Sequence, residues 1–182
     1  MPVTPTGPLS LMLSRAAEIL AASPSFRAVV GAGNESQALA KIHYPCVNWE
    51  RDRDDTTPLP TRPLAIISRV YGDEFRIDNR GARDGTLTFS FEFPVSTSFL
   101  ASGDADSLVL ADAQGAELQY LNDVGAILLD LINLSNAVKA GGGNYVRIVD
   151  IDMSVPPMLA ELDIENGGPQ LFFTSAWIVR FN

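Results

Sequence analysis

The run QLFFTSAWIVRFN, Gln170 to Asn182, decides the fold class of this chain. It is rich in aromatic and β-branched residues, and Arg180 is its one basic residue. Side chains of these types favour a pleated, half-buried surface, so the run predicts a strand inside a sheet. Another strand is predicted by TLTFSFEFPV, Thr86 to Val95, in which apolar and polar residues alternate. This period of two places four apolar side chains on one face: Leu87, Phe89, Phe91 and Phe93.

Three more strands are predicted along the chain. They are IHYPCVNW at 42–49, LAIISRVY at 64–71 and YVRIVDIDM at 145–153. Pro45 favours an edge position or strand entry for the first, and Pro156-Pro157 is expected to end the last. The segment GDEFRIDNRGARDG at 72–85 has the glycines and charges of a hairpin end. The strands on either side of it therefore form a long projecting hairpin.

Helical spacing of apolar residues predicts two principal helices. The first begins at Leu9 and stops at Ser23-Pro24. A capping box formed by Asn34 and Gln37 predicts a short helix after it. The longest helix runs from about Gly115 to Val138 and ends before the segment AGGGN. Its core-facing stripe is predicted to contain Leu118, Leu121, Gly125, Leu128 and Ile132, widened by Val124, Leu129 and Leu131.

This order of elements indicates an α+β fold. We expect a mainly antiparallel sheet with the two principal helices packed on one face and a long β-hairpin projection. Residues 1–182 are expected to form a single domain. Residues 1–8 are read as a flexible arm, and 50–63 and 96–113 as long loops.

Composition excludes some classes of function. The chain has 182 residues, of which 46% are hydrophobic, and a formal net charge of -9. Binding to nucleic acid through its phosphates needs local positive charge, so a basic nucleic-acid groove is not expected. Cys46 is the single cysteine, which rules out an intramolecular disulfide. No stretch approaches the roughly 20 apolar residues that span a bilayer, so we expect a soluble protein without membrane contact.

Few residues carry recognisable chemistry. Asp150 and Asp152 share one strand face, and Asp163 and Glu165 form a similar pair. Four carboxylates brought together would bind Mg²⁺ or Ca²⁺, so a metal-dependent hydrolase is one alternative. Alternation along a strand produces the same pattern on a solvated face, and we prefer that interpretation. We therefore predict no catalytic residue, no cofactor, no metal site and no enzymatic activity.

Two charged segments are candidates for contacts with other subunits. One is the loop Glu50, Arg51, Asp52, Arg53, Asp54 and Asp55. The other is the hairpin end, whose Arg76, Arg80 and Arg83 are able to pair with carboxylates of a neighbouring subunit. Loops held by a rigid sheet are frequent sites of recognition, and solvated surface loops are the alternative.

The order of several segments along the chain is also informative. They are LSLMLSRAAEIL as the opening helix, YPCVNW as the first strand, DGTLTFSFEFPV as the second arm of the hairpin, a long helix before YVRIVDIDM, and the turn ENGGP before SAWIVRFN. Together they resemble the tail terminator proteins of long-tailed bacteriophages, the family of the lambda minor tail protein U. The resemblance covers most of the chain as a pattern of elements.

The resemblance implies a structural protein of the virion, made in the host bacterial cytoplasm and placed at the neck end of the tail. It implies a homo-oligomer, usually a hexameric ring, that caps the tail tube, stops its polymerisation and offers a surface for head docking. The implied partners are the tail tube protein and a head-completion or stopper protein, and DNA passes through the lumen without specific binding. The nearest alternative is a head-completion or stopper protein of the neck, and a monomeric ligand-binding domain is a more distant one.

Overall fold

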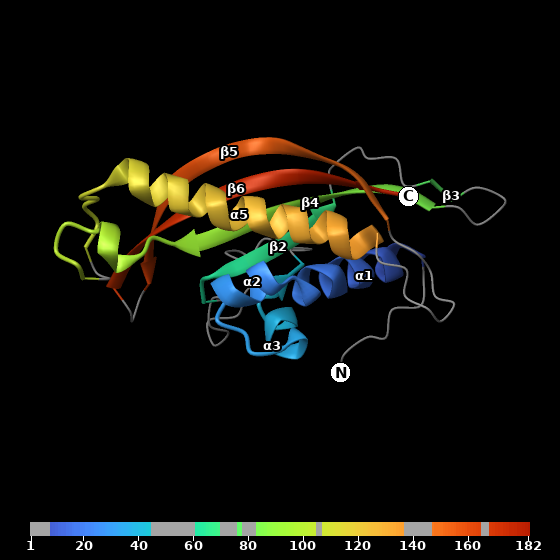
Figure 1. Ribbon diagram of the computed structural model, residues 1–182, viewed down its shortest axis with the longest axis horizontal. Helices are drawn as coiled ribbons and strands as arrows, with labels where there is room; N and C mark the ends of the chain where they lie inside the picture. Colours follow the sequence, from blue (N-terminus) through green and yellow to red (C-terminus); the bar gives the residue numbers. More distant parts are fainter. Residues whose placement is uncertain are drawn as a thin grey trace.

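The computed structural model describes residues 8–44, 61–69, 76–77, 83–104, 107–136, 147–164 and 168–182 (Figure 1). The helices are α1 (Pro8–Ala22), α2 (Pro24–Val29), α3 (Glu35–Leu39), the 3-10 turn η1 (Thr97–Phe99) and α5 (Ala113–Asn136). The strands are β1 (Ile42–His43), β2 (Leu64–Arg69), β3 (Arg76–Ile77), β4 (Arg83–Pro94), β5 (Ile148–Ile164) and β6 (Gly168–Phe181). The predicted α+β class is confirmed.

The strands pair in the order β1-β2-β4-β6-β5, and β3 pairs with the start of β4. The β1–β2 pairing is parallel and the others are antiparallel. The two runs that predicted the sheet, in β4 and β6, lie side by side in its interior, with Phe89 opposite Trp177. Interior strands have neighbours on both sides, which explains why their sequences are the most apolar and β-branched. Among the described strands, β5 lies at an edge.

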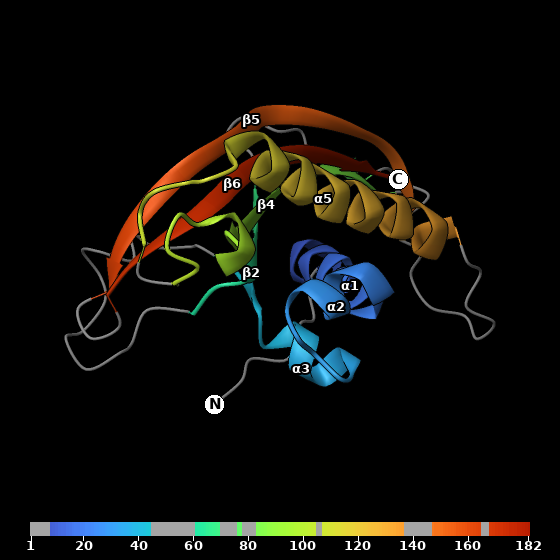
Figure 2. The same ribbon diagram turned by 60° about the vertical axis from the view of Figure 1, so that its left-hand side comes forward.

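The helices cover one face of the sheet. In Figure 2 the sheet arches over α5, with α1, α2 and α3 below it. Alternate residues of the two central strands point into this layer, so that Leu87, Phe89 and Val179 are fully buried. They meet Leu20 of α1 and Val124 of α5 in one core. The alternation in β4 thus predicted the buried face correctly.

Short-range polar contacts shape the turns between the first helices. The Ser23 hydroxyl accepts a hydrogen bond of 3.0 Å from the Phe26 amide, so Ser23 both follows α1 and caps α2. The Asn34 side chain caps α3 by accepting from the Gln37 amide at 3.0 Å. Gln37 in turn accepts from the amide of Gly33 rather than that of Asn34. The predicted cap is confirmed, with its reciprocal bond displaced by one residue.

The strand β5 continues through the two prolines that were expected to end it. Its pairing with β6 shifts register between Met153 and Val155, and again between Val155 and Met158. Proline is tolerated at sheet edges and bulges, because the missing amide would have pointed away from the neighbouring strand. The prediction that Pro156-Pro157 breaks the strand was wrong for this reason.

The predicted core stripe of α5 was also wrong. The side chains that α5 buries are Ala116, Tyr120, Val124, Ile127 and Leu131. Val124 and Leu131 were expected at its margin, whereas the predicted central residues Leu118, Leu121 and Ile132 are exposed. The helix carries apolar residues around most of its circumference, so apolar spacing alone did not select the buried side.

Other boundaries moved by smaller amounts. α1 begins at Pro8, within the predicted arm 1–8, and the remainder of that arm lies outside the described residues. Of the predicted strand 42–49, Ile42 and His43 form β1 and residues 45–49 lie outside the description. Most of the predicted loop 50–63 also lies outside it. The predicted loop 96–113 contains η1 and an isolated bridge between Leu100 and Leu110. In the described part of the chain, no helix has the length and apolar character needed to cross a membrane.

Candidate interaction surface

An apolar row runs along the outward side of α5. Leu118 and Leu129 are each 60% exposed, and Leu121 and Ile132 are also exposed. Residues at these spacings lie on one side of a helix, so the row extends for about 20 Å. Gly125 lies in the middle of the row, and a Cβ atom built on it would meet nothing within 4 Å. The row therefore has a shallow centre between leucines.

The strand beside α5 is also unusually apolar for an edge. Both views place α5 and β5 side by side (Figures 1 and 2). Met153 is 54% exposed and Met158 52%. Met153 and Leu159 pair with Trp177 and Phe173 on the helical face of the sheet, whereas Val155 and Met158 pair with Ala176 and Thr174 on the opposite face. The α5/β5 surface is defined here as the exposed apolar residues of α5 and of the helical face of β5: Leu118, Leu121, Leu129, Ile132, Met153 and Leu159. Exposed apolar side chains gathered on neighbouring elements are typical of interaction sites.

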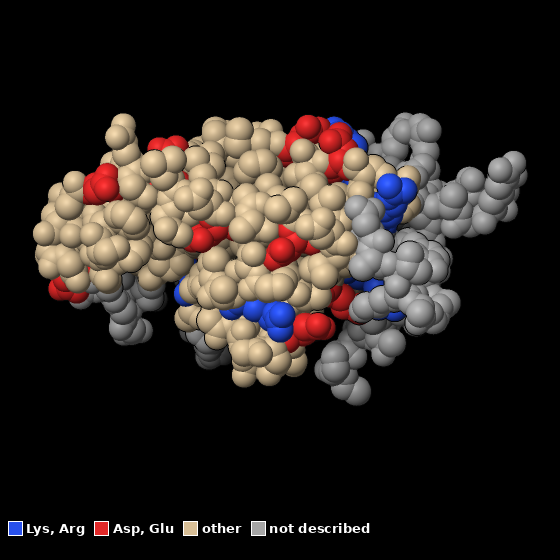
Figure 3. Space-filling model, viewed as in Figure 1, with Lys and Arg blue, Asp and Glu red and all other residues tan. Residues whose placement is uncertain are grey.

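The charge on these two elements has a single sign. α5 contains three acidic residues and β5 four, and neither contains Lys or Arg. Figure 3 shows a largely uncharged face in the view of Figure 1, with separated acidic side chains over its upper part and basic side chains below the centre and at the right. An apolar surface bordered by carboxylates favours a partner that is apolar and neutral or basic.

A buried polar network holds α5 against the sheet. The Tyr120 hydroxyl donates to the Phe91 carbonyl at 3.0 Å and lies 2.7 Å from the Ser175 hydroxyl oxygen. Because a tyrosine hydroxyl has one hydrogen, Ser175 is the donor in the second bond. The Trp177 indole N–H donates to the Ser175 oxygen at 2.8 Å. Burial raises the pKa of Tyr120, outweighing its hydrogen bond with Ser175, so the hydroxyl stays protonated. This network fixes which side of α5 faces outward.

A second polar contact joins α5 to the turn between α1 and α2. The Asp130 carboxylate accepts from the Ser23 hydroxyl at 2.7 Å and from the Ser25 amide at 3.0 Å. Partial desolvation raises the pKa of Asp130, but these hydrogen bonds outweigh it and leave the pKa below its usual value of 3.8. The ionised carboxylate therefore ties α5 to the helical layer below it.

The carboxylates of Asp150 and Asp152 in β5 already form ion pairs within the chain. Arg180 of β6 makes ion pairs with both Asp150 and Asp152, the latter at 2.7 Å. Within the described residues, no three His, Cys, Asp or Glu side chains gather closely enough to hold a metal ion. The side chains of Asp163 and Glu165, which the hydrolase alternative also requires, lie outside the described part.

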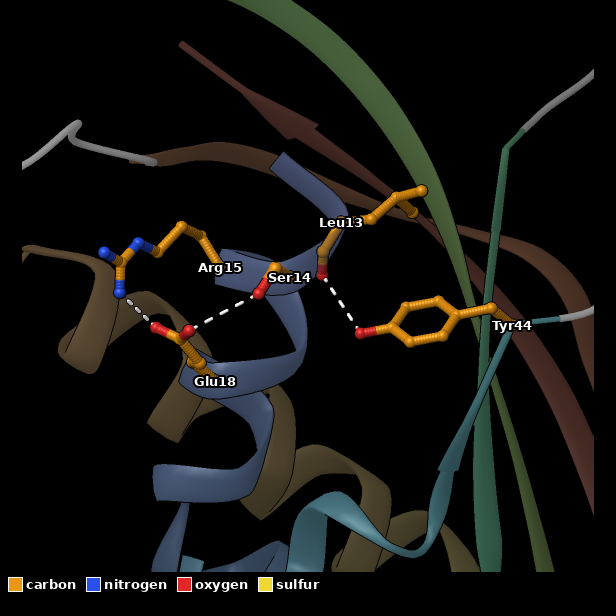
Figure 4. Close-up of polar contacts among 5 residues, drawn as sticks. All are labelled: Leu13, Ser14, Arg15, Glu18 and Tyr44. Atoms are coloured by element: carbon orange, nitrogen blue, oxygen red, sulfur yellow. Dashed lines mark hydrogen bonds and ion pairs between the residues drawn. The ribbon is translucent and has the colours of Figure 1, made fainter. Parts of the chain in front are cut away.

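An exposed polar cluster joins α1 to the end of β1 (Figure 4). The Tyr44 hydroxyl donates to the Leu13 carbonyl at 3.4 Å. On the same helix, Arg15 pairs with Glu18, and the Ser14 hydroxyl donates to the same carboxylate at 3.4 Å. Burial, and then the nearby Glu18 charge, raise the pKa of Tyr44. These contacts connect two elements and bring together no nucleophile and base.

The predicted contact residues lie mostly outside the described part of the chain. This holds for Glu50, Arg51, Asp52, Arg53, Asp54, Asp55 and Arg80. Arg76 pairs opposite Asp84, and Arg83 opposite Ile77, in the β3–β4 ladder, and their side chains are not described. The α5/β5 surface was missed because its helical half was assigned to the core. Tyr120 was the available signal, since its hydroxyl favours a buried site with polar partners.

No protein-family model matches the chain, and no curated protein matches it in sequence.

Proposed function

We propose that this chain is a structural assembly protein that resembles the tail terminators of long-tailed bacteriophages. In this proposal its subunits form a ring, hexameric in the family it resembles, that caps the tail tube. The ring stops tube polymerisation and presents a surface to a head-completion or stopper protein. The protein has no enzymatic role and acts in the virion, at the neck end of the tail.

The observation that carries the proposal is the α5/β5 surface. It exposes six large apolar side chains on two adjacent elements, and one of those elements is an edge strand among the described strands. Leaving such side chains in water is unfavourable by roughly 25 cal/mol for each Å² of apolar area. A protein whose role is to associate with other subunits recovers this free energy on assembly.

Symmetry and charge also support a ring around DNA. A cap on a ring of identical tube subunits gains affinity when it repeats the same symmetry, because many weak contacts form together. A net charge of -9 disfavours adhesion to phosphates, which suits a channel through which DNA must slide.

The test measures the mass of the purified chain in solution and images it by negative stain. We expect rings with a central hole, and shorter tubes when the chain is added to polymerising tail tube protein. A chain that stays monomeric at its highest soluble concentration and leaves tube length unchanged would overturn the proposal. Binding to the portal side of the neck, with no effect on tubes, would favour the stopper alternative.

A further inference from the structure

We draw no further inference here: the strongest candidate, the exposed apolar row of Leu118, Leu121, Leu129 and Ile132 on the outward side of α5, carries none, because nothing in the structure shows what covers it.

Discussion

Replacing Tyr120 with phenylalanine tests whether the buried hydroxyl network fixes α5 on the sheet. The substitution keeps the aromatic ring, whose centroid lies 5.7 Å from that of Phe93 and 5.4 Å from that of Phe173. No cavity is created, so the change isolates the hydroxyl. It removes the donor to the Phe91 carbonyl and the acceptor of the Ser175 hydroxyl.

The expected loss follows from these two bonds. A buried polar group left without a partner costs about 1–3 kcal/mol. The Phe91 carbonyl belongs to a strand that pairs on both sides, and Ser175 still accepts from Trp177, so we expect a loss of about 2 kcal/mol. For a chain of this size that lowers the melting temperature by roughly 4–8 °C.

The assay is thermal and urea unfolding followed by circular dichroism, with Tyr44→Phe as the control. Tyr44 is 40% exposed and its hydroxyl bond is long, at 3.4 Å, so its loss should cost less than about 0.5 kcal/mol. The double variant with Ser175→Ala should lose less than the sum of the two single changes, because both belong to one network. Equal stability of Tyr120→Phe and Tyr44→Phe would refute the reasoning.

Three further predictions concern charged groups. Asp130→Asn should be less stable than the wild type at pH 7. Because folding lowers the pKa of Asp130, the contribution of its carboxylate to the free energy of unfolding is complete above pH 3.8 and is lost as the pH falls. Unfolding measured from pH 7 to 3 should therefore show the stability difference between variant and wild type shrinking below pH 3.8. Arg62→Ala should cost roughly 2 kcal/mol in urea unfolding, since it leaves the Glu92 carboxylate, 17% exposed, without the partner that lies 2.5 Å away. The exposed pair of Arg15 provides the control, and Arg15→Ala should cost less than about 0.5 kcal/mol. Millimolar Mg²⁺, Mn²⁺ or Ca²⁺ should leave the melting temperature unchanged, because Arg180 already pairs with the β5 carboxylates; a shift abolished by Asp150→Asn with Asp152→Asn would instead support the hydrolase alternative.

The sequence predicted well those elements whose local residue pattern is compatible with only one kind of secondary structure. The alternation around Phe89 required a half-buried strand, and Asn34 with Gln37 required a helix start. Ser23 and Pro24 marked the α1–α2 junction correctly, because a serine cap and an N-terminal proline act within one turn. The antiparallel pairing of β4 with β6, which joins their apolar faces, was not predicted from the sequence.

The errors lie where the outcome depended on neighbours far along the chain. On α5, Leu118 and Val124 have the same hydrophobic character, and the position of the sheet decides which of them is buried. At Pro156 the outcome depended on whether the strand had one neighbour or two. The α5/β5 surface could not be predicted from periodicity, because a core stripe and an interaction stripe have the same spacing.

The two prolines in β5 have a consequence for how copies of this protein accumulate in a cell. The described strands leave one side of the 17-residue strand β5 unpaired, and such an edge is a template on which another chain can add strand by strand, the route to fibrous aggregates. Pro156 and Pro157 lack backbone donors and lie at a register shift near its middle, a local irregularity that disfavours a continuous added strand. Newly made chains can then remain dispersed at high concentration until they meet the correct surface.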